Sequence, residues 1–469
     1  MVQALDAAAL SWSGPATAAR KAPGRDDKSI YQSGPQPAAF KGIRLATDNG
    51  AGASSQRYKV FAIVVLVNLT VWLDEGVFGA LTPYWAKDLH LSVEQIGTAS
   101  AAYLLTTFMM LFIGGVISDL VGAKRVLLVV VAGSAVLSGA MLAVNSYETL
   151  VLRNLVFGAF FGGLWGPCNR LIALWLPPRD RAHFAALWMS STLFSFVLSN
   201  PVGLLIAEHA SWRTAFLVVT AMSVPSLLLL LWIRDRPDQM KSVSPAELKL
   251  IYAGRDVQKE LDSERFHWRG ALEALHQRDV VLMIVATALA TTPTWLIVTW
   301  GTYGLLNGFK VDAAKASLLG DIGLMIPVVY GFMHGWVVNK VFGQRCRPVL
   351  AAGPIIGGIG FLIAAFFHPG AEMWALAVYG AGFLSDPFYW GTINAYWAGL
   401  TKPEYLGTIN GLSGACQTAV GYLLISWSGT WVRHGVEGPE ALRNIWLIGG
   451  VIFLLAAVPI YFAREVRTA

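Results

Sequence analysis

The chain has 469 residues, of which 55% are apolar and 14% are charged. Because an average soluble domain carries about 25% charged residues, this composition excludes an ordinary soluble enzyme, a disordered protein and a disulfide-rich secreted scaffold. The net charge is +6, but the Lys and Arg residues lie between hydrophobic runs, which indicates membrane topology rather than nucleic-acid binding.

Residues 1–57 are rich in Ala, Gly, Ser and Pro and have no hydrophobic period. Such a segment cannot bury enough apolar surface to fold, and it lacks the apolar core of a signal peptide. We predict a disordered cytosolic tail over 1–57.

A helix that crosses a bilayer needs about 20 mostly apolar residues. Twelve such stretches follow the tail, and a charged break divides them into six and six. We predict an all-α membrane protein with an N-terminal six-helix bundle over 58–233, a cytosolic linker with short helices over 234–278, and a C-terminal six-helix bundle over 279–465. The predicted spans are 60–84, 98–118, 124–143, 150–175, 183–207, 214–233, 279–305, 314–338, 348–368, 373–398, 406–431 and 441–463.

The orientation follows from the basic residues, because cytoplasmic loops carry an excess of Lys and Arg. With the amino terminus in the cytoplasm, 28 of the 35 Lys and Arg residues lie on the cytosolic side. We therefore predict that both termini are cytoplasmic, in a multi-pass protein of the cell inner (plasma) membrane. We expect a monomer in the lipid bilayer with no nucleic-acid partner.

The three cysteines, Cys168, Cys346 and Cys416, form no CxxC motif and no Cys/His spacing typical of a metal site. We expect no disulfide, no metal and no cofactor. The chain also lacks a nucleophile–base pair, a glycine-rich nucleotide loop and an HExxH motif, so we expect no catalytic residues and no enzyme.

An internal repeat relates the two halves. The segment that begins at Gly115 has the pattern G-x3-D-x2-G-x-K-R, and a degenerate copy begins 220 residues later at Gly335. Pro167 and Pro387 are separated by the same 220 residues. A shared offset favours two duplicated, pseudo-symmetric halves around a central cavity, with the substrate site near the midplane of the membrane.

The repeated loop has the chemistry of a gate. The carboxylate of Asp119 can pair with Lys124 or Arg125 and with a neighbouring helix end, and Asn339 and Arg345 occupy the second copy. A charge clamp of this kind can hold one state of a two-state transporter. We predict a gate at these five residues and expect Asp119→Ala to change the transport rate more than ligand affinity.

Five further motifs are distributed along the chain. They are Trp72-Leu-Asp74, Leu91-Ser-Val-Glu-Gln-Ile-Gly97, Trp175-Leu-Pro-Pro-Arg-Asp-Arg181-Ala, Ser211-Trp-Arg-Thr-Ala-Phe216 and Ser244-Pro-Ala-Glu247. With the repeated loop, they make the chain resemble the major facilitator superfamily over nearly all of 58–465, and the finer features resemble its anion:cation symporter family. The resemblance implies twelve helices, alternating access and transport of small organic anions with protons or sodium.

Charged residues inside the spans are functional candidates, because a charge at the bilayer centre costs at least about 2.5–3.5 kcal/mol. Asp74 and Glu75 lie about two-thirds along the first span, and adjacent helical positions point about 100° apart, so at most one faces the cavity squarely. Asp386 lies in the middle of the tenth span. Arg153 is either part of the site or a structural partner for an acid of the first span, and Asp321 is interpreted as an interfacial residue.

The resemblance implies that Asp74 is the acid of the family's Asp-Arg pair, but Glu75 stands where the family has arginine. The family's glutamate in the fourth span is absent as well. A buried carboxyl group can hold a proton in one state and release it in another. We predict proton coupling or substrate contact at Asp74, Glu75, Asp386 and Arg153, and we expect Asp74→Asn to abolish proton-driven uptake.

Polar and aromatic residues of the seventh, tenth and eleventh spans are candidates for the substrate cavity. The seventh span contains the helix-breaking sequence Thr291-Thr-Pro-Thr294. Aromatic faces beside a carboxylate suit an aromatic substrate, or an amine held by cation–π contact. The predicted cavity residues are Trp295, Tyr389, Trp390, Asn394, Asn410 and Gln417.

We predict a secondary active transporter for proton-coupled uptake (symport) of a small organic solute, most simply an organic carboxylate, with a proton or sodium as the coupling ion. A transporter of an amine or zwitterion is favoured instead by the missing arginine. A proton-coupled exporter is a further alternative, against which the poor match of Asn200–Gly203 to the antiporter motif argues. A membrane receptor with the same fold also remains open.

Overall fold

The computed structural model describes residues 54–252, 276–367, 370–400 and 406–467. The predicted tail up to residue 53 and residues 253–275 of the predicted linker lie outside this range. Within it the chain is helical, apart from one isolated bridge between Arg345 and Arg467. The all-α prediction is confirmed.

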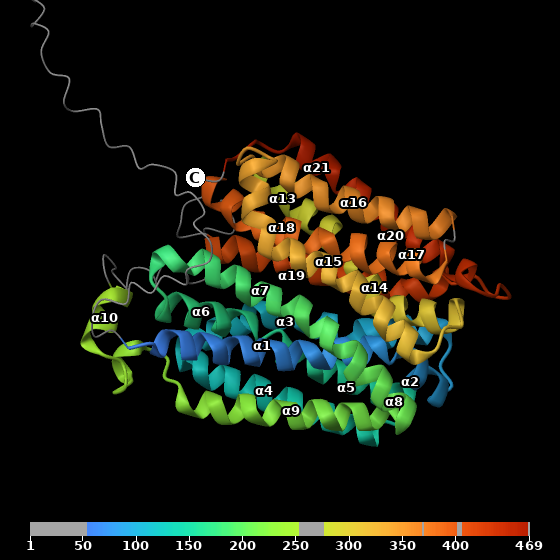
Figure 1. The fold of residues 1–469 in the computed structure, drawn as a ribbon, viewed down its shortest axis with the longest axis horizontal. Helices are drawn as coiled ribbons and strands as arrows, with labels where there is room; N and C mark the ends of the chain where they lie inside the picture. The colour runs from blue at the N-terminus through green and yellow to red at the C-terminus, as the bar shows by residue number, and fades with distance from the viewer. Residues whose placement is uncertain (1–53, 253–275, 368–369, 401–405, 468–469) are drawn as a thin grey trace, which may run out of the picture. The chain divides into compact units, whose positions relative to one another are not determined.

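Two groups of helices pack against each other (Figure 1), mainly through the pairs α1–α14, α3–α19 and α7–α15. The N-terminal helix group comprises α1 (Gln56–Ala80), α2 (Thr82–Asp88), α3 (Val93–Val121), α4 (Ala123–Ala140), α5 (Tyr147–Phe161), α6 (Trp165–Trp175), α7 (Pro178–Asn200), α8 (Ile206–His209) and α9 (Trp212–Trp232). The C-terminal helix group comprises α13 (Arg278–Thr291), α14 (Thr294–Tyr303), α15 (Ala313–Lys340), α16 (Cys346–Phe366), α17 (Ala371–Ala375), α18 (Gly382–Leu400), α19 (Leu406–Ser428), α20 (Arg443–Leu455) and α21 (Ala457–Phe462). Helix α10 (Pro245–Tyr252) lies in the connection between them.

Nine helical segments among the described residues are long and apolar enough to cross a membrane. They overlap nine of the twelve predicted spans. Helices α3, α18 and α19 occupy the ranges of the other three, so the count of twelve crossings stays a prediction. The break in the seventh span is confirmed, because α13 ends at Thr291 and α14 begins at Thr294, around a proline that has no backbone N–H to donate.

The start of α1 is held by the connection between the helix groups. The first N–H groups of a helix have no partner within the helix, and here Glu247 of α10 accepts hydrogen bonds from the backbone N–H of Arg57 at 3.0 Å and of Gln56 at 3.3 Å. The same carboxylate pairs with the Arg57 guanidinium at 3.4 Å and accepts a bond from the Ser54 hydroxyl. The Ser244–Glu247 motif therefore anchors the connection to α1.

Replacing Glu247 with alanine is expected to lower the free energy of unfolding by about 1–3 kcal/mol, because buried donors lose their acceptor. The apparent melting temperature of the purified protein measures this effect. Lys249→Ala, an exposed change on the same helix, serves as the control. Equal melting temperatures for the two variants would contradict the anchoring role.

Each helix group ends with the same carboxylate arrangement. Asp235, three residues after the end of α9, accepts a bond at 2.7 Å from the backbone N–H of Lys124, the second residue of α4. Glu465, three residues after the end of α21, accepts a bond at 3.1 Å from the N–H of Arg347, the second residue of α16. A carboxylate at a helix N-terminus satisfies free donors and complements the helix dipole. The arrangement is a structural counterpart of the sequence repeat.

The first copy of this cap explains a glycine of the repeated motif. Gly122 joins α3 to α4 with φ +95°, a left-handed conformation that other residues rarely adopt. An added Cβ at this position would lie 2.6 Å from a carboxylate oxygen of Asp235. Only glycine therefore permits both the turn and the cap.

The Ser211–Phe216 motif joins α9 to α2. The Ser211 hydroxyl accepts a bond from the N–H of Thr214 and caps α9. Arg213 pairs with Asp88 at 2.7 Å, and this hydrogen bond holds the pKa of the Asp88 carboxyl below its usual range. The motif thus connects two helix ends within the N-terminal helix group.

Candidate functional site

Asp74 and Arg153 form a buried ion pair inside the N-terminal helix group. The Arg153 guanidinium lies 2.6 Å from Asp74 Oδ1, and the side chains are 4% and 2% exposed. The hydroxyl of Ser138 donates a second hydrogen bond to the same carboxylate. Arg153 also donates to the carbonyl of Leu137 at 3.1 Å and to Asn154 Oδ1 at 3.1 Å. Its charge is therefore used within its own helix group.

Glu75 lies on a different face of α1. Trp72 and Gly79, three residues before it and four residues after it, share its side of the helix, and both contact α14 of the other helix group. The Trp72 ring stacks on Trp295, and an added Cβ at Gly79 would lie 2.5 Å from the carbonyl oxygen of Val298. Glu75 therefore lies on the side of α1 that meets the C-terminal helix group.

The Glu75 side chain has no cationic partner among the described residues. It is 3% exposed, and none of the ion pairs between described side chains involves it. The hydroxyl of Tyr103 on α3 and, more weakly, the guanidinium of Arg153 are close enough to interact with it electrostatically. The structure thus separates the two adjacent acids: Asp74 is paired inside one group, and Glu75 faces the other.

Asp386 occupies the corresponding face of α18. Phe383 and Trp390, three residues before it and four after it, both contact the N-terminal helix group, Phe383 through Phe196 at 5.5 Å and Trp390 through Trp165 at 6.2 Å between ring centroids. Asp386 Oδ1 is buried and has no hydrogen-bond partner among the described residues. Each helix group therefore presents to the other one acid that forms no ion pair with a described residue.

Aromatic side chains surround the contact between α1 and α14. The rings of Trp72 and Trp295 are 6.0 Å apart and inclined by 10°. Phe161 packs edge-on against Trp72 at 4.8 Å, and Tyr103 packs edge-on against Trp295 at 6.1 Å. The indole N–H groups of both tryptophans are buried and have no acceptor among the described residues.

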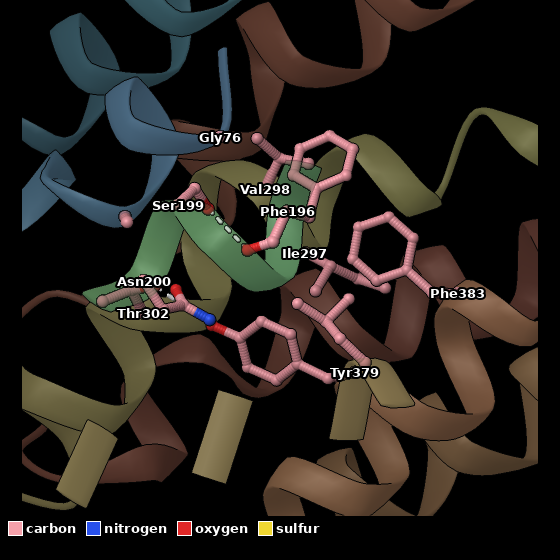
Figure 2. Close-up of a pocket in the computed structure, with 11 residues that line it drawn as sticks. Gly76, Phe196, Ser199, Asn200, Ile297, Val298, Thr302, Tyr379 and Phe383 are labelled. Atoms are coloured by element: carbon pink, nitrogen blue, oxygen red, sulfur yellow. Dashed lines mark hydrogen bonds between the residues drawn. The ribbon is translucent and has the colours of Figure 1, made fainter. Parts of the chain in front are cut away.

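A small cavity lies between the helix groups (Figure 2). Gly76, the residue that follows Glu75 on α1, is one of the residues that line it. Phe196 and Phe383 form one side of it, and Asn200 and Tyr379 lie on another. The Tyr379 hydroxyl is 3.1 Å from the hydroxyl of Thr302. The lining residues are Gly76, Ala80, Phe196, Ser199, Asn200, Ile297, Val298, Thr302, Leu324, Tyr379 and Phe383.

One polar contact between the helix groups was not predicted from the sequence. The Asn200 amide of α7 donates a hydrogen bond to Asp321 of α15 at 2.8 Å, beside the cavity that Asn200 lines. Asp321 was interpreted as an interfacial residue because it lies only a few residues into its span. Its partner comes from the other helix group, which no local sequence pattern predicts.

The other predicted cavity residues are spread over the C-terminal helix group. Tyr389 is buried, with its hydroxyl 2.7 Å from that of Thr287 on α13, so it faces its own group. Trp390 contacts Trp165, as described above. The Asn394 side chain is exposed, and Asn410 and Gln417 are half-buried. Of this set, Trp295 and Trp390 are the residues in aromatic contact with described rings of the other group.

The predicted gate residues are only partly described. The side chain of Asp119 lies outside the described residues. The Lys124 ammonium donates to the carbonyl of Leu231 at 2.7 Å, and Arg345 pairs with Glu465 at 3.4 Å, so each contacts its own helix group. Arg125 and Asn339 are exposed. The gate stays a prediction.

Among the described side chains, no three His, Cys, Asp or Glu residues lie close enough together to hold a metal ion.

Comparisons with known proteins agree with this architecture. The sequence pattern of the Major Facilitator Superfamily matches residues 64–426. The chain is 26% identical to the hexuronate transporter of Bacillus subtilis over 63% of this chain and 67% of that protein. It is 22% identical to the gallate transporter of Pseudomonas putida over 76% of this chain and 81% of that protein.

A likeness to solved structures shows the fold. A partially occluded, inward-open structure of the xylose transporter XylE from E. coli superposes with a TM-score of 0.67, at 17% identity, over 88% of this chain and 99% of that chain. The family match over residues 64–426 confirms the superfamily resemblance predicted from the sequence.

Proposed function

Because the chain belongs to the major facilitator superfamily, we propose that it is a secondary active transporter that takes up a small organic carboxylate together with protons by alternating access. It is a multi-pass membrane protein and not an enzyme. The proposal includes twelve membrane crossings, cytoplasmic termini, a monomer in the inner (plasma) membrane, and the division into helical bundles over 58–233 and 279–465.

The observation that carries the proposal is that two acids at the contact between the helix groups, Glu75 and Asp386, form no ion pair with any described residue. An isolated carboxylate in a medium of low dielectric constant is costly, so such a group takes up a proton instead. When the helix groups move apart on one side, water reaches the acid and the proton can leave. Alternating access thus supplies the change of surroundings that proton coupling needs.

The same geometry couples the proton to an anionic substrate. A carboxylate that binds beside Glu75 would place two negative charges close together, which is unfavourable. Protonation of Glu75 removes the repulsion, so substrate and proton bind together and leave together. Because Asp74 already has Arg153 as its counter-ion, we assign the coupling proton to Glu75 rather than to Asp74.

Two observations bear on the substrate class, and they favour different substrates. The two relatives above are named for organic acids, which supports an organic carboxylate. An amine or zwitterion is favoured by a different observation, namely that Glu75 and Asp386 form no ion pair among the described residues, whereas Arg153 is paired with Asp74. A buried acid can hold either a proton or an ammonium group.

A thermal-shift screen at two pH values distinguishes these substrates, because a ligand that binds the folded state raises its stability. We expect carboxylates to raise the apparent melting temperature of the purified protein, and to do so more strongly at acid pH. Stabilisation by amines alone, stronger at alkaline pH, would contradict the proposed substrate class.

Asp386→Asn is expected to slow transport at least about tenfold without lowering the melting temperature. Asparagine keeps the shape but cannot exchange a proton. The change also removes a carboxylate whose Oδ1 is buried without a hydrogen-bond partner among the described residues, which is costly in the wild type. Uptake into vesicles and thermal unfolding measure the two effects. Glu437→Gln, an exposed change, is the control, and wild-type transport by Asp386→Asn would exclude a role for this acid.

A further inference from the structure

We propose that the small cavity between the helix groups binds one monovalent metal cation, held by side-chain oxygens of Asn200, Thr302 and Tyr379 and balanced by the charge of Asp321. The cation is not the coupling ion, because the proton on Glu75 keeps that role. It is a resident ion that stabilises the closed contact between the two helix groups.

The cavity takes its polar residues from both helix groups (Figure 2). Asn200 is the last residue of α7, whereas Thr302 lies on α14 and Tyr379 precedes α18. The cavity has a volume of about 20 Å³, which is enough for one water molecule or one ion of that size but not for an organic acid. An ion bound here would therefore join the two groups without taking the place of a substrate.

Three interruptions of the α-helical backbone meet at this cavity. They are the π-helical turns η2 (Pro201–Leu205), η4 (Gly304–Gly308) and η5 (Leu376–Ala381). Asn200 lies directly before η2, Thr302 lies two residues before η4, and Tyr379 lies within η5. Such turns are rare and occur mostly at functional sites. Irregular backbone at membrane depth is tolerated where it is buried in protein or lines a cavity, and interrupted helices of this kind hold ions in transporters.

The three polar side chains keep oxygen atoms available. Each is at most 5% exposed. The Asn200 amide N–H donates to Asp321 at 2.8 Å, whereas its Oδ1 accepts no hydrogen bond from a described residue. The hydroxyls of Thr302 and Tyr379 are 3.1 Å apart and, among the described residues, bond only to each other. Thr287 of α13 instead donates to a carbonyl four residues earlier in its own helix, as threonines in helices usually do.

The charge beside the cavity favours a cation. Asp321 is half-buried and forms no ion pair with a described residue, and its hydrogen-bond partners Asn200 and Ser317 are both neutral. A carboxylate that is withdrawn from water is costly unless another charge balances it. Oxygen atoms of carboxylates, amides and hydroxyls are the ligands that hard cations prefer. One carboxylate balances one positive charge, so a monovalent ion fits this site better than a divalent one.

Two glycines leave room for the polar groups. An added Cβ at Gly320 would lie 2.8 Å from Asn200 Nδ2, and an added Cβ at Gly301 would lie 2.6 Å from the hydroxyl oxygen of Tyr379. A larger residue at either position would displace the amide or the hydroxyl. The close approach of the backbone therefore fixes both groups beside the cavity.

The test measures the apparent melting temperature of the full-length purified protein, without substrate, in sodium chloride and in choline chloride at equal ionic strength. Choline is too large for the cavity. A cation that binds the folded state raises its stability, so we expect a higher melting temperature in sodium, with an effect that saturates as the sodium concentration rises.

Two variants locate the ion. Thr302→Val keeps the size of the side chain and removes one oxygen, and Asp321→Asn removes the charge but keeps an acceptor for Asn200. Each should weaken the apparent affinity for sodium at least about tenfold. Asp312→Asn is the matched control, because it changes an exposed acid at the start of the same helix to a residue that also caps helices. It should respond to sodium like the wild type.

The outcomes separate this inference from the proposed function. Equal melting temperatures in the two salts would overturn the cation site and leave water in the cavity. A saturable sodium effect that persists in both Thr302→Val and Asp321→Asn would also overturn it, because the ion would then bind elsewhere. If Asp321→Asn does not fold, Thr302→Val still decides. Uptake driven by a pH gradient tests the transport proposal independently, since each result can hold without the other.

Discussion

Replacing Glu75 with glutamine is expected to abolish proton-driven accumulation of substrate while leaving substrate exchange intact. For one proton per substrate, a gradient of one pH unit supports roughly tenfold accumulation, because about 1.4 kcal/mol corresponds to a factor of ten. Glutamine imitates the protonated acid but cannot release a proton, so the gradient can no longer be used. The accumulation ratio in proteoliposomes should fall to about one.

The matched control for this experiment is Glu208→Gln, which changes an exposed acid of α8 in the same helix group. It should accumulate substrate like the wild type. Counterflow exchange at equal pH on both sides should remain measurable in Glu75→Gln, since binding and movement of the helix groups do not need the proton to leave. Normal pH-driven accumulation by Glu75→Gln would exclude Glu75 as the coupling group.

Arg153→Leu is expected to destabilise the protein by about 3–5 kcal/mol, because removing one partner leaves the other charge buried and uncompensated. Both side chains of the Asp74–Arg153 pair are less than 5% exposed, with a contact of 2.6 Å. Arg213→Leu is a useful comparison, since its pair with Asp88 is partly exposed and should contribute at most about 1 kcal/mol.

A double variant separates a structural role of this pair from a role in coupling. In Asp74→Leu/Arg153→Leu no charge is left unpaired, so most of the lost stability should return. If the pair is structural, the double variant should also keep pH-driven transport. Loss of coupling in a stable double variant would return the coupling role to Asp74, as the family resemblance implies.

The positions of the helices could be predicted from the sequence because apolar runs and helix breaks are local features of the chain. The nine segments that meet the criteria for crossing a membrane overlap predicted spans, and the break around Pro293 followed from proline chemistry. The internal repeat could also be recognised locally, because two similar loop sequences lie 220 residues apart. Its structural counterpart, the paired caps by Asp235 and Glu465, could not be located in advance, because each cap joins segments more than a hundred residues apart.

The orientation of the two adjacent acids depended on long-range packing. Helical geometry indicated that Asp74 and Glu75 diverge, but it did not indicate which of them faces the other helix group. That choice is made by Ser138 and Arg153 on one side of α1, and by the close approach of Gly79 to α14 on the other. None of these contacts leaves a pattern near residue 74 in the sequence.

The aromatic site was predicted only in part for the same reason. Trp295 was among the candidates because of the break beside it, whereas Trp72 was noted only as part of a motif. Tyr389 was a candidate by its proximity to Asp386, yet its hydroxyl bonds within the C-terminal helix group. A residue's neighbours along one helix do not determine which of its faces meets another helix.

The most direct measurement is uptake of a labelled carboxylate by proteoliposomes that contain the purified protein, with and without an imposed pH gradient. Benzoate and galacturonate represent an aromatic and a polyhydroxylated carboxylate. The account predicts accumulation above the outside concentration when the outside is acidic, and no accumulation when a protonophore collapses the gradient or when Glu75 is glutamine. Accumulation that ignores the pH gradient would contradict proton-coupled symport.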